Sequence, residues 1–276
     1  MFAQLISDIG SLWEKYGTVY LTGIANTLIL AVTATAIGCI IGFLCGILQT
    51  IPYNAHDNLA RRFFLKLIRI IIRIYVEIFR GTPMILQAVF IYYGLPYFFG
   101  VTFSNIWTVS IIVVSINTGA YMAESVRGGI MSIDVGQFEG AKSIGMNHWQ
   151  TMLYVVLPQT LRNIMPQIGN NYIINVKDTS VMFIIGFSDF FAVHKMVSGA
   201  VFKYFPSAFM EMAGYLCMTL LASFLLRKFE KKLAGKSNYE LVNADQLVLT
   251  AGTYSYPDSA GSPFEEMNKD YKGETK

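Results

Sequence analysis

Long apolar stretches separated by short polar connections dominate the first 236 residues of the chain. Residues 16–55 contain no Asp, Glu, Lys or Arg, and residues 81–123 are also free of charge. Because a helix needs about 20 consecutive apolar residues to cross a bilayer, this pattern predicts an all-α membrane protein with five transmembrane helices. The predicted spans lie at about residues 22–48, 70–93, 103–123, 166–187 and 207–226.

Two local patterns refine these spans. The charge-free run at residues 81–123 is too long for a single helix, and Gly-Leu-Pro at residues 94–96 followed by Gly100 predicts a turn in its middle. In the first span, glycines recur every four residues, which places them on one face and predicts close approach of another helix. These residues are Gly38, Gly42 and Gly46.

The rest of the chain divides around a transmembrane domain predicted at residues 18–236. Residues 1–17 have apolar side chains at helical spacing, which predicts a short amphipathic helix on the membrane surface. The more polar residues 124–158 predict an extended loop that contains a short helix. Residues 237–276 are polar without an apolar stripe, and they are expected to form a disordered tail.

The distribution of positive charge predicts the orientation. Charged residues make up only 14% of the chain, against about 25% in soluble domains. One set of connections, residues 55–73, 124–162 and 227–236, holds 13 Lys and Arg, whereas the opposite set holds three. Because cytoplasmic loops carry the excess of Lys and Arg, we expect the N-terminus outside and the C-terminus in the cytoplasm.

No catalytic or metal site is predicted from the residue types. The three cysteines and three histidines are scattered, without a C-x-x-C or a histidine pair at helical spacing. The chain has no G-x-x-x-x-G-K-[ST] phosphate loop. A net charge of +3 is too small to favour nucleic acid as a partner. We therefore expect neither an ATPase site nor a bound cofactor in this chain.

The predicted cytoplasmic loop contains the most specific motif. Glu139–Gly145 has the sequence EGAKSIG, and Val155 and Leu157-Pro158 follow at fixed spacing. This pattern resembles the EAA loop of ABC importer permeases, with two small departures: Gly140 replaces an alanine and Val155 replaces an isoleucine. The resemblance implies that the loop couples the chain to a separate ATPase.

A short helix in that loop has features suited to a partner. Ala141 and Gly145 are four residues apart, which predicts a shared face that a partner approaches closely. Glu139 near the helix start is favoured by the helix dipole and is placed to meet a partner cation. The alternative is a simple surface loop between spans. The predicted coupling residues are Glu139, Gly140, Ala141, Gly145, Leu157 and Pro158.

Three further motifs in the same order narrow the resemblance. Residues 77–83 (EIFRGTP), 123–130 (AESVRGGI, followed by Gly136-Gln137) and 177–180 (KDTS) resemble elements of permeases for polar amino acids. Together with the loop they cover about residues 18–232. The chain is thus identified as a member of the histidine, glutamine, glutamate, arginine and opine group of importers.

Membership implies a division of labour among several chains. Two permease subunits, identical or related, form the pathway with the type I importer fold. Two ABC ATPase subunits bind ATP and Mg²⁺ and contact the cytoplasmic loops. An extracytoplasmic binding protein delivers the amino acid. The assembly is expected in the bacterial plasma (inner) membrane, with this chain crossing it several times.

Charged and amide side chains inside the fourth predicted span suggest where the substrate passes. A charge within a span is costly and usually faces a cavity or a partner. Asn171, Asn175 and Asp178 share one helical face, so we expect them to line a path in which Asp178 meets the ammonium group of an amino acid. Thr179 and Ser180 are expected to bond its carboxylate. The alternative is an interhelical ion pair, such as Lys177 with Glu77 or Glu211.

Glu77 and Arg80 allow two interpretations. Together with Arg73 they are spaced to form an ion-pair ladder along one helix before the break at residues 81–83. Alternatively, Glu77 and Arg80 take part in the pathway or its gate.

Two other functions stay open at this stage: an ion-coupled secondary amino acid transporter and an integral membrane enzyme. The first often shows internal repeats, which we do not find, and the second needs converging catalytic groups.

Overall fold

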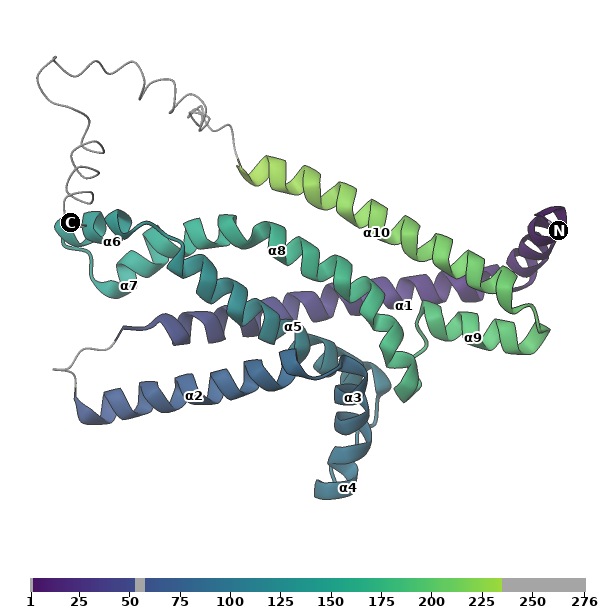
Figure 1. Ribbon diagram of the computed structural model, residues 1–276, viewed down its shortest axis with the longest axis horizontal. Coiled ribbons are helices and arrows are strands. Elements are labelled where there is room, and N and C mark those ends of the chain that lie inside the picture. The colour runs from purple at the N-terminus through teal and green to yellow at the C-terminus, as the bar shows by residue number, and fades with distance from the viewer. Residues whose placement is uncertain (1, 53–57, 235–276) are drawn as a thin grey trace, which may run out of the picture. The chain divides into compact units, whose positions relative to one another are not determined.

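The computed structural model describes residues 2–52 and 58–234 (Figure 1). The chain divides into two compact units, residues 1–233 and 234–276, and every contact given below lies within the first. Because the second unit falls almost entirely outside the described residues, the predicted tail at 237–276 stays a prediction. The described residues form helices and contain no strand, which confirms the all-α class.

Thirteen helical segments follow one another along the described part of the chain. Three of them, named η, are tighter or wider turns that continue a neighbouring α-helix. The segments are α1 (Phe2–Thr50), α2 (Leu59–Gly81), α3 (Met84–Val89), η1 (Phe90–Gly94), α4 (Leu95–Phe99), α5 (Ile106–Met131), α6 (Val135–Ser143), α7 (His148–Thr151), η2 (Met152–Val156), α8 (Leu157–Asp178), η3 (Thr179–Ile185), α9 (Phe190–Val201) and α10 (Tyr204–Ala234).

Three helices are long and apolar enough to cross a membrane: α1, α5 and α10. A fourth span results if His148–Ile185 and Phe190–Val201, which meet at 53°, count together. Helix α2 carries seven charged side chains in 23 residues, and it is not among the helices that are apolar enough to cross a membrane by composition. The five-span count and the outside position of the N-terminus therefore stay predictions.

Helix α1 packs closely on α5, which crosses it near the middle of the bundle (Figure 1). A Cβ atom added at Gly38, Gly42 or Gly46 would lie 2.6, 2.3 and 2.6 Å from the nearest side-chain atom of α5. Because real Cβ atoms essentially never approach this closely, only glycine fits at the contact. The close approach predicted from the glycine spacing is confirmed.

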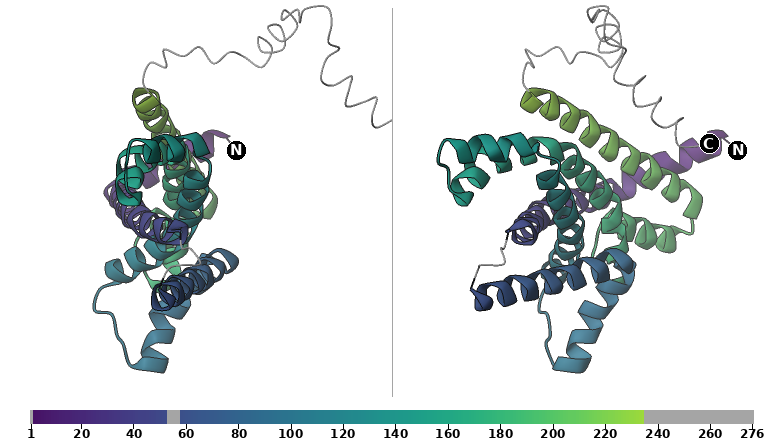
Figure 2. Two further views of the ribbon diagram at one scale, coloured as in Figure 1. Left: turned by 90° about the vertical axis from the view of Figure 1, so that its left-hand side faces the viewer. Right: turned by 60° about the vertical axis from the view of Figure 1, so that its left-hand side comes forward.

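The turn predicted from residues 94–96 and Gly100 comes at Gly100 and not at residues 94–96. The chain stays helical through η1 and α4, and it leaves the helix at Gly100, whose φ is +67°. Pro96 lies in the first turn of α4, where its missing N–H is not needed by the helix. The separate break expected at residues 81–83 is found at Thr82-Pro83, where Thr82 is extended as the residue before a proline tends to be. Helices α3 and α4 then project from the side of the bundle (Figure 2).

The helix in the region of the fourth predicted span, residues 166–187, has different bounds from those predicted. Helix α8 begins nine residues earlier, at Leu157, and contains Pro166 in its interior. It ends at Asp178, after which the chain tightens into η3 until Gly186, whose φ is +87°. Lys177 and Asp178 therefore lie at the end of a helix, where side chains have more freedom to reach a cavity. A short helix, α9, follows at Phe190–Val201.

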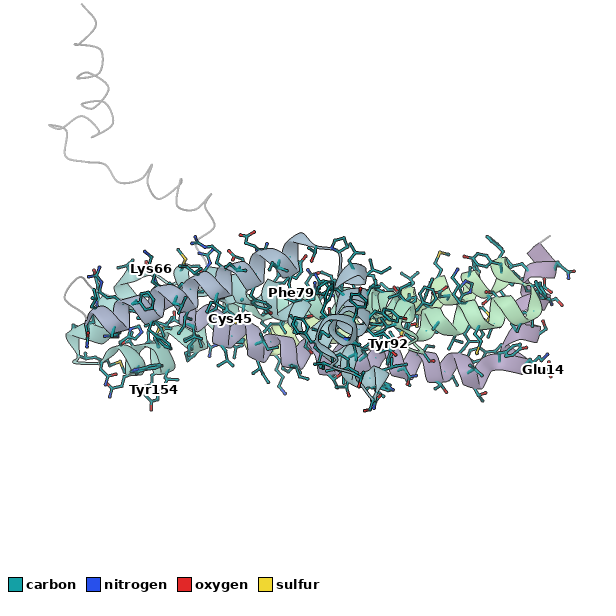
Figure 3. All side chains as sticks on the ribbon, turned by 90° about the horizontal axis from the view of Figure 1, so that it is seen from below. Glu14, Cys45, Lys66, Phe79, Tyr92 and Tyr154 are labelled. Carbon is teal, nitrogen blue, oxygen red and sulfur yellow. The ribbon has the colours of Figure 1, made fainter. Side chains whose placement is uncertain are left out.

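Lys66 and Tyr154 lie at one end of the bundle, and Glu14 lies at the other end (Figure 3). Residues 2–17 are helical, but they continue without a break into the rest of α1. Asp8 in this part accepts a hydrogen bond from Lys203 Nζ at 2.7 Å, and Leu12 is buried. Whether this segment lies on a membrane surface stays a prediction.

Candidate functional site

A cavity of about 450 Å³ lies where the end of α2 meets α3, α5 and α8, and we name it the deep cavity. It brings together the three residues predicted to share one face of the fourth span, and adds Arg80 from the opposite side. Its lining consists of Arg80, Gly81, Thr82, Pro83, Met84, Asn117, Thr118, Tyr121, Asn171, Ile174, Asn175 and Asp178.

The two asparagines of the deep cavity are fixed by the neighbouring helices. Asn175 Nδ2 donates to Thr35 Oγ1 of α1 at 2.7 Å and to Thr118 Oγ1 of α5 at 2.9 Å. Asn171 Nδ2 contacts the sulfur of Met122 at 3.1 Å. Both asparagines are at least 95% buried, and buried amides need such partners. The scaffold therefore holds polar groups in fixed orientations against the cavity.

A second amide pair holds the break between α2 and α3 in place. Gln87 Nε2 donates to the carbonyls of Phe79 and Thr82 at 3.0 and 2.9 Å. Asn117 Nδ2 donates to Gln87 Oε1 at 3.0 Å and to the Phe79 carbonyl at 3.1 Å. These bonds satisfy carbonyls that the interrupted helix leaves open. This pair was not predicted from the sequence, where the signal was the presence of amide side chains in a charge-free run.

Thr179 and Ser180 do not line the deep cavity. Thr179 is fully buried, and its hydroxyl donates to the Val176 carbonyl at 3.0 Å. Their neighbour Lys177 is exposed, and the described residues show no ion pair between it and Glu77 or Glu211. The structure therefore brings Asp178 into the cavity but not the two hydroxyl residues that follow it.

A second cavity of about 380 Å³ lies between α1, α2 and α5, and we name it the charged cavity. Arg80 lines both cavities, so they adjoin. Glu124 of α5 is paired with Arg127 and lies 3.9 Å from Arg80. The pairing of Glu124 with Arg127 agrees with their spacing on α5. The ladder expected within α2 is not found among the described residues, because Arg80 reaches across to α5 instead.

The EAA-like segment forms a capped helix, α6. Asp134 caps its start by accepting a hydrogen bond from the Gly136 N–H at 2.7 Å. At its end the N–H groups of Gly145 and Met146 donate to the carbonyls of Lys142 and Ala141, and Gly145 has φ of +81°. This is a Schellman arrangement, which a glycine accommodates because it has no Cβ.

The predicted shared face of Ala141 and Gly145 is wrong. Helix α6 ends at Ser143, so Gly145 lies beyond it as a cap rather than on its surface. Ala141 is 95% buried and faces the protein's own interior. Glu139 and Gly140 are exposed, and a Cβ atom at Gly140 would meet nothing within 4 Å. Of the predicted coupling residues in this segment, Glu139, Gly140 and Gly145 are therefore exposed, and only Ala141 is not.

Large apolar side chains are exposed along the segment from the end of α5 to η2, and we name this set the coupling surface. Soluble surfaces rarely expose so many large apolar groups without a partner. Leu157 and Pro158 follow directly at the start of α8. Burial lowers the pKa of His148 in this segment, and the positive charges of Arg61 and Lys142 lower it further. The coupling surface consists of Met131, Val135, Ile144, Trp149, Leu153 and Tyr154.

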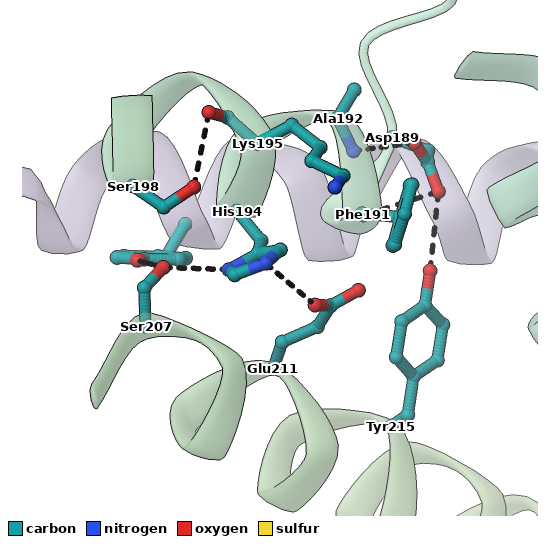
Figure 4. Close-up of polar contacts among 10 residues, drawn as sticks. Asp189, Phe191, Ala192, His194, Lys195, Ser198, Ser207, Glu211 and Tyr215 are labelled. Carbon is teal, nitrogen blue, oxygen red and sulfur yellow. Dashed lines mark hydrogen bonds and ion pairs between the residues drawn. The ribbon is translucent and has the colours of Figure 1, made fainter. Parts of the chain in front are cut away.

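A buried polar network joins α9 and α10 to α1 near the N-terminal end of α1, and Figure 4 shows much of it. Ser207 Oγ lies 2.6 Å from the Tyr20 hydroxyl and 2.8 Å from His194 Nδ1. His194 Nε2 lies 3.7 Å from Glu211 Oε2. This supplies the partner for Glu211 that the sequence did not indicate. Although serine, histidine and glutamate adjoin, Ser207 is fully buried, so no substrate reaches it.

Tyr215 and Asp189 extend this network. Asp189 caps α9 by accepting hydrogen bonds from the N–H groups of Phe191 and Ala192, and Tyr215 donates its hydroxyl proton to Asp189 at 3.1 Å. The described residues hold no group of three or more His, Cys, Asp or Glu placed to bind a metal ion. The network is therefore best described as a buried set of hydrogen bonds that fixes three helices.

Comparison with known proteins gives the same family from sequence and from structure. The chain is 31% identical to the glutamine transport system permease protein GlnP of Escherichia coli K12 over 226 residues, which cover 82% of this chain and 97% of that protein. It is 33% identical to the putative glutamine transport system permease protein GlnP of Rickettsia felis, covering 76% and 91% of the two chains.

Solved structures have the same fold. A crystal structure of an amino acid ABC transporter with histidines matches at a TM-score of 0.69 and 33% identity, over 79% of this chain and 95% of that chain. An inward-facing MetNI methionine ABC transporter matches at a TM-score of 0.66 over 80% and 98% of the two chains. Because this second pair is only 18% identical, it supports the fold alone.

The match to a family covers more than half of the chain. Residues 58–235 match the family described as "Binding-protein-dependent transport system inner membrane component". This range contains α2, all the residues that line the deep cavity, and the whole coupling surface. Thr35 of α1, which accepts a hydrogen bond from Asn175, lies outside it. The chain belongs to this family of inner membrane components of binding-protein-dependent transport systems, and it has the type I ABC importer permease fold.

Proposed function

We propose that the chain forms the transmembrane pathway of an ATP-driven importer of polar amino acids, and that the substrate passes through the deep cavity. One observation carries this proposal: Asp178 and Arg80 line the same cavity beside two buried amides. A free amino acid presents one ammonium and one carboxylate, and opposite charges that line one cavity complement both. The permease relatives named for glutamine support the same substrate class.

The residues of the deep cavity divide the binding task. Asp178 accepts hydrogen bonds from the ammonium group, and Arg80 donates to the carboxylate in place of Thr179 and Ser180, which lie away from the cavity. Asn171 presents its amide to the side chain of the substrate, and Asn175, whose N–H groups are bonded to Thr35 and Thr118, offers its carbonyl oxygen. Because an amide both donates and accepts, such a lining suits a side chain like that of glutamine.

The coupling surface is proposed to dock on a separate ABC ATPase that binds ATP and Mg²⁺. Its exposed apolar side chains offer contact area, and exposed Glu139 offers a charge to a partner cation. Closure of the ATPase pair would then move α6 and, through Leu157 and Pro158, the start of α8. A second permease subunit and an extracytoplasmic binding protein complete the assembly in the bacterial inner membrane.

The proposal is tested by glutamine uptake into proteoliposomes that contain this chain, its ATPase and its binding protein. We expect uptake to need ATP, and Glu139→Lys to abolish both uptake and stimulation of the ATPase by the loaded binding protein. Glu14→Lys, an exposed acid at the other end of the bundle, is the matched control and should keep both. Uptake that follows an ion gradient without ATP would instead establish a secondary transporter.

A further inference from the structure

Helix α2 carries a polar stripe along its whole length. Arg62, Lys66, Arg69, Arg73, Glu77 and Arg80 follow one another at spacings of three or four, so they share one face. The stripe extends about 27 Å along the helix axis. The other side of the helix exposes isoleucines, among them Ile71, Ile74 and Ile78. In a membrane such a helix turns its charges toward a cavity and its isoleucines toward lipid.

The C-terminal half of this stripe lines the charged cavity. Four arginines and two glutamates surround it, which gives the lining a net charge of +2. Glu124 is already neutralised by Arg127 and Arg80. Arg73 and Glu77, by contrast, make no side-chain hydrogen bond or ion pair within the described part of the chain. Two opposite charges one helical turn apart therefore face the cavity and are not engaged by the protein itself.

The charged cavity adjoins the deep cavity through Arg80. From Arg80 the stripe leads back along α2 to Arg69, about 16 Å away along the helix axis. The N-terminal end of α2 is the end predicted to lie in the cytoplasm. An amino acid that leaves the deep cavity toward the cytoplasm would thus enter the charged cavity next.

The tendency of cytoplasmic loops to carry Lys and Arg does not explain the positions of the charged residues in the second half of α2. That rule concerns Lys and Arg in loops and near the ends of spans, and it explains Arg61, Arg62 and Lys66 at the start of α2. It does not explain why Arg73 and Arg80 lie four to six turns into the helix, nor why Glu77 stands between them. Their common feature is the cavity that they line.

We propose that the charged cavity is a second amino-acid site, in which Arg73 binds the α-carboxylate and Glu77 the α-ammonium group. The remaining positive charge of the lining then acts on the side chain. It favours neutral or acidic side chains, such as those of glutamine and glutamate, and repels the cationic side chains of arginine and lysine. This inference rests on the proposed function, because it assumes that amino acids pass through the chain.

Equilibrium binding of radiolabelled glutamine to the permease–ATPase complex in lipid nanodiscs tests the site directly. The binding protein is left out, so that its own selectivity does not enter. We expect two glutamines per permease chain, with Arg73→Gln and Glu77→Gln each weakening one of them by about fivefold. Arg73→Lys keeps the charge and should retain most of the binding. Arg62→Gln, on the same stripe but outside the cavity, is the matched control.

Charge reversal tests the predicted selectivity. In the unmodified complex, glutamate should compete with bound glutamine more strongly than arginine does. Arg73→Glu, which lowers the net charge of the lining from +2 to zero, should remove this preference. A single glutamine per chain, or identical binding by Arg73→Gln and Arg62→Gln, would overturn the second site. If ATP-driven glutamine uptake persists in those cases, the proposed function stands without it. If the unmodified complex neither binds nor imports any amino acid, the proposed function itself fails.

Discussion

Helix α5 has two unlike neighbours, α1 on one flank and α2 on the other. Against α1 the contact is so close that a single added carbon at Gly42 would lie 2.3 Å from the Cβ atom of Met122. Against α2 the helices leave the charged cavity open between them. Tyr75 donates to the Ile116 carbonyl at 2.6 Å, Asn117 donates to the Phe79 carbonyl at 3.1 Å, and Arg80 lies 3.9 Å from Glu124. The first flank therefore acts as a fixed scaffold, and the second provides solvated space.

The same contrast exists in the composition of the two neighbours. Residues 16–50 of α1 carry no charged side chain, whereas α2 carries seven in 23 residues. Small residues allow backbones to approach within a membrane, and charged residues persist there only next to a cavity or a partner. We therefore expect the α1 side of α5 to serve packing and its α2 side to serve transport. Substitutions on one side should affect stability, and substitutions on the other should affect uptake.

The largest effect is expected at the close contact. Gly42→Val should lower the free energy of unfolding by about 3 kcal/mol, because the added carbons cannot fit against Met122 without moving the helix. Thermal unfolding in detergent, followed by tryptophan fluorescence, measures the loss. Gly10→Val, on the same helix but with nothing within 4 Å, should change stability little. Equal stability of both variants would contradict the scaffold assignment.

The buried network near the start of α1 should give the next largest effect. Ser207→Ala is expected to cost about 2 kcal/mol, because Tyr20 and His194 both lose the hydroxyl they contact while remaining buried. Ser223→Ala on the same helix removes only a local bond to the Thr219 carbonyl. The two variants are compared by the same unfolding assay. A cost at Ser223 as large as that at Ser207 would argue against a specific role for the network.

On the solvated side the expected effect is on transport rather than on stability. Asp178→Asn keeps the size of the side chain but removes the charge proposed to bind the ammonium group. ATP-driven glutamine uptake should fall about tenfold, which corresponds to about 1.4 kcal/mol, with an unchanged unfolding temperature. Ser180→Ala, two residues after Asp178 but outside the cavity, should retain uptake. Full uptake by Asp178→Asn would remove the deep cavity from the pathway.

Patterns with a fixed spacing were sufficient to predict several features. The glycines of α1 were correctly assigned to a close contact. Asn171, Asn175 and Asp178 share one helical face and line one cavity, and their place in a substrate path stays a prediction. Both predictions depend only on helical periodicity, which holds wherever the helix itself is correct. The family also followed from motifs in a fixed order, and the comparison with GlnP and the amino acid ABC transporter structure confirmed it.

The errors arose where a residue has more than one structural use. Pro96 is compatible with a turn and with the first turn of a helix, and the structure uses the second. Gly145 fits a helix face by spacing, but it serves as the cap that ends the helix. Pairings such as Gln87 with Asn117 or Glu211 with His194 join distant segments. Their partners depend on how the helices pack, which no local pattern specifies.

The central claim is that substrate passes along the α2 side of α5 and not along α1. Accessibility to a water-soluble thiol reagent tests it most directly, in a variant whose native Cys39, Cys45 and Cys217 are serine. We predict that Tyr121→Cys, in the deep cavity, is labelled and that glutamine protects it. Ile40→Cys, on the apolar outer face of α1, should stay unlabelled. Labelling of the α1 position together with no protection by glutamine at residue 121 would contradict the account.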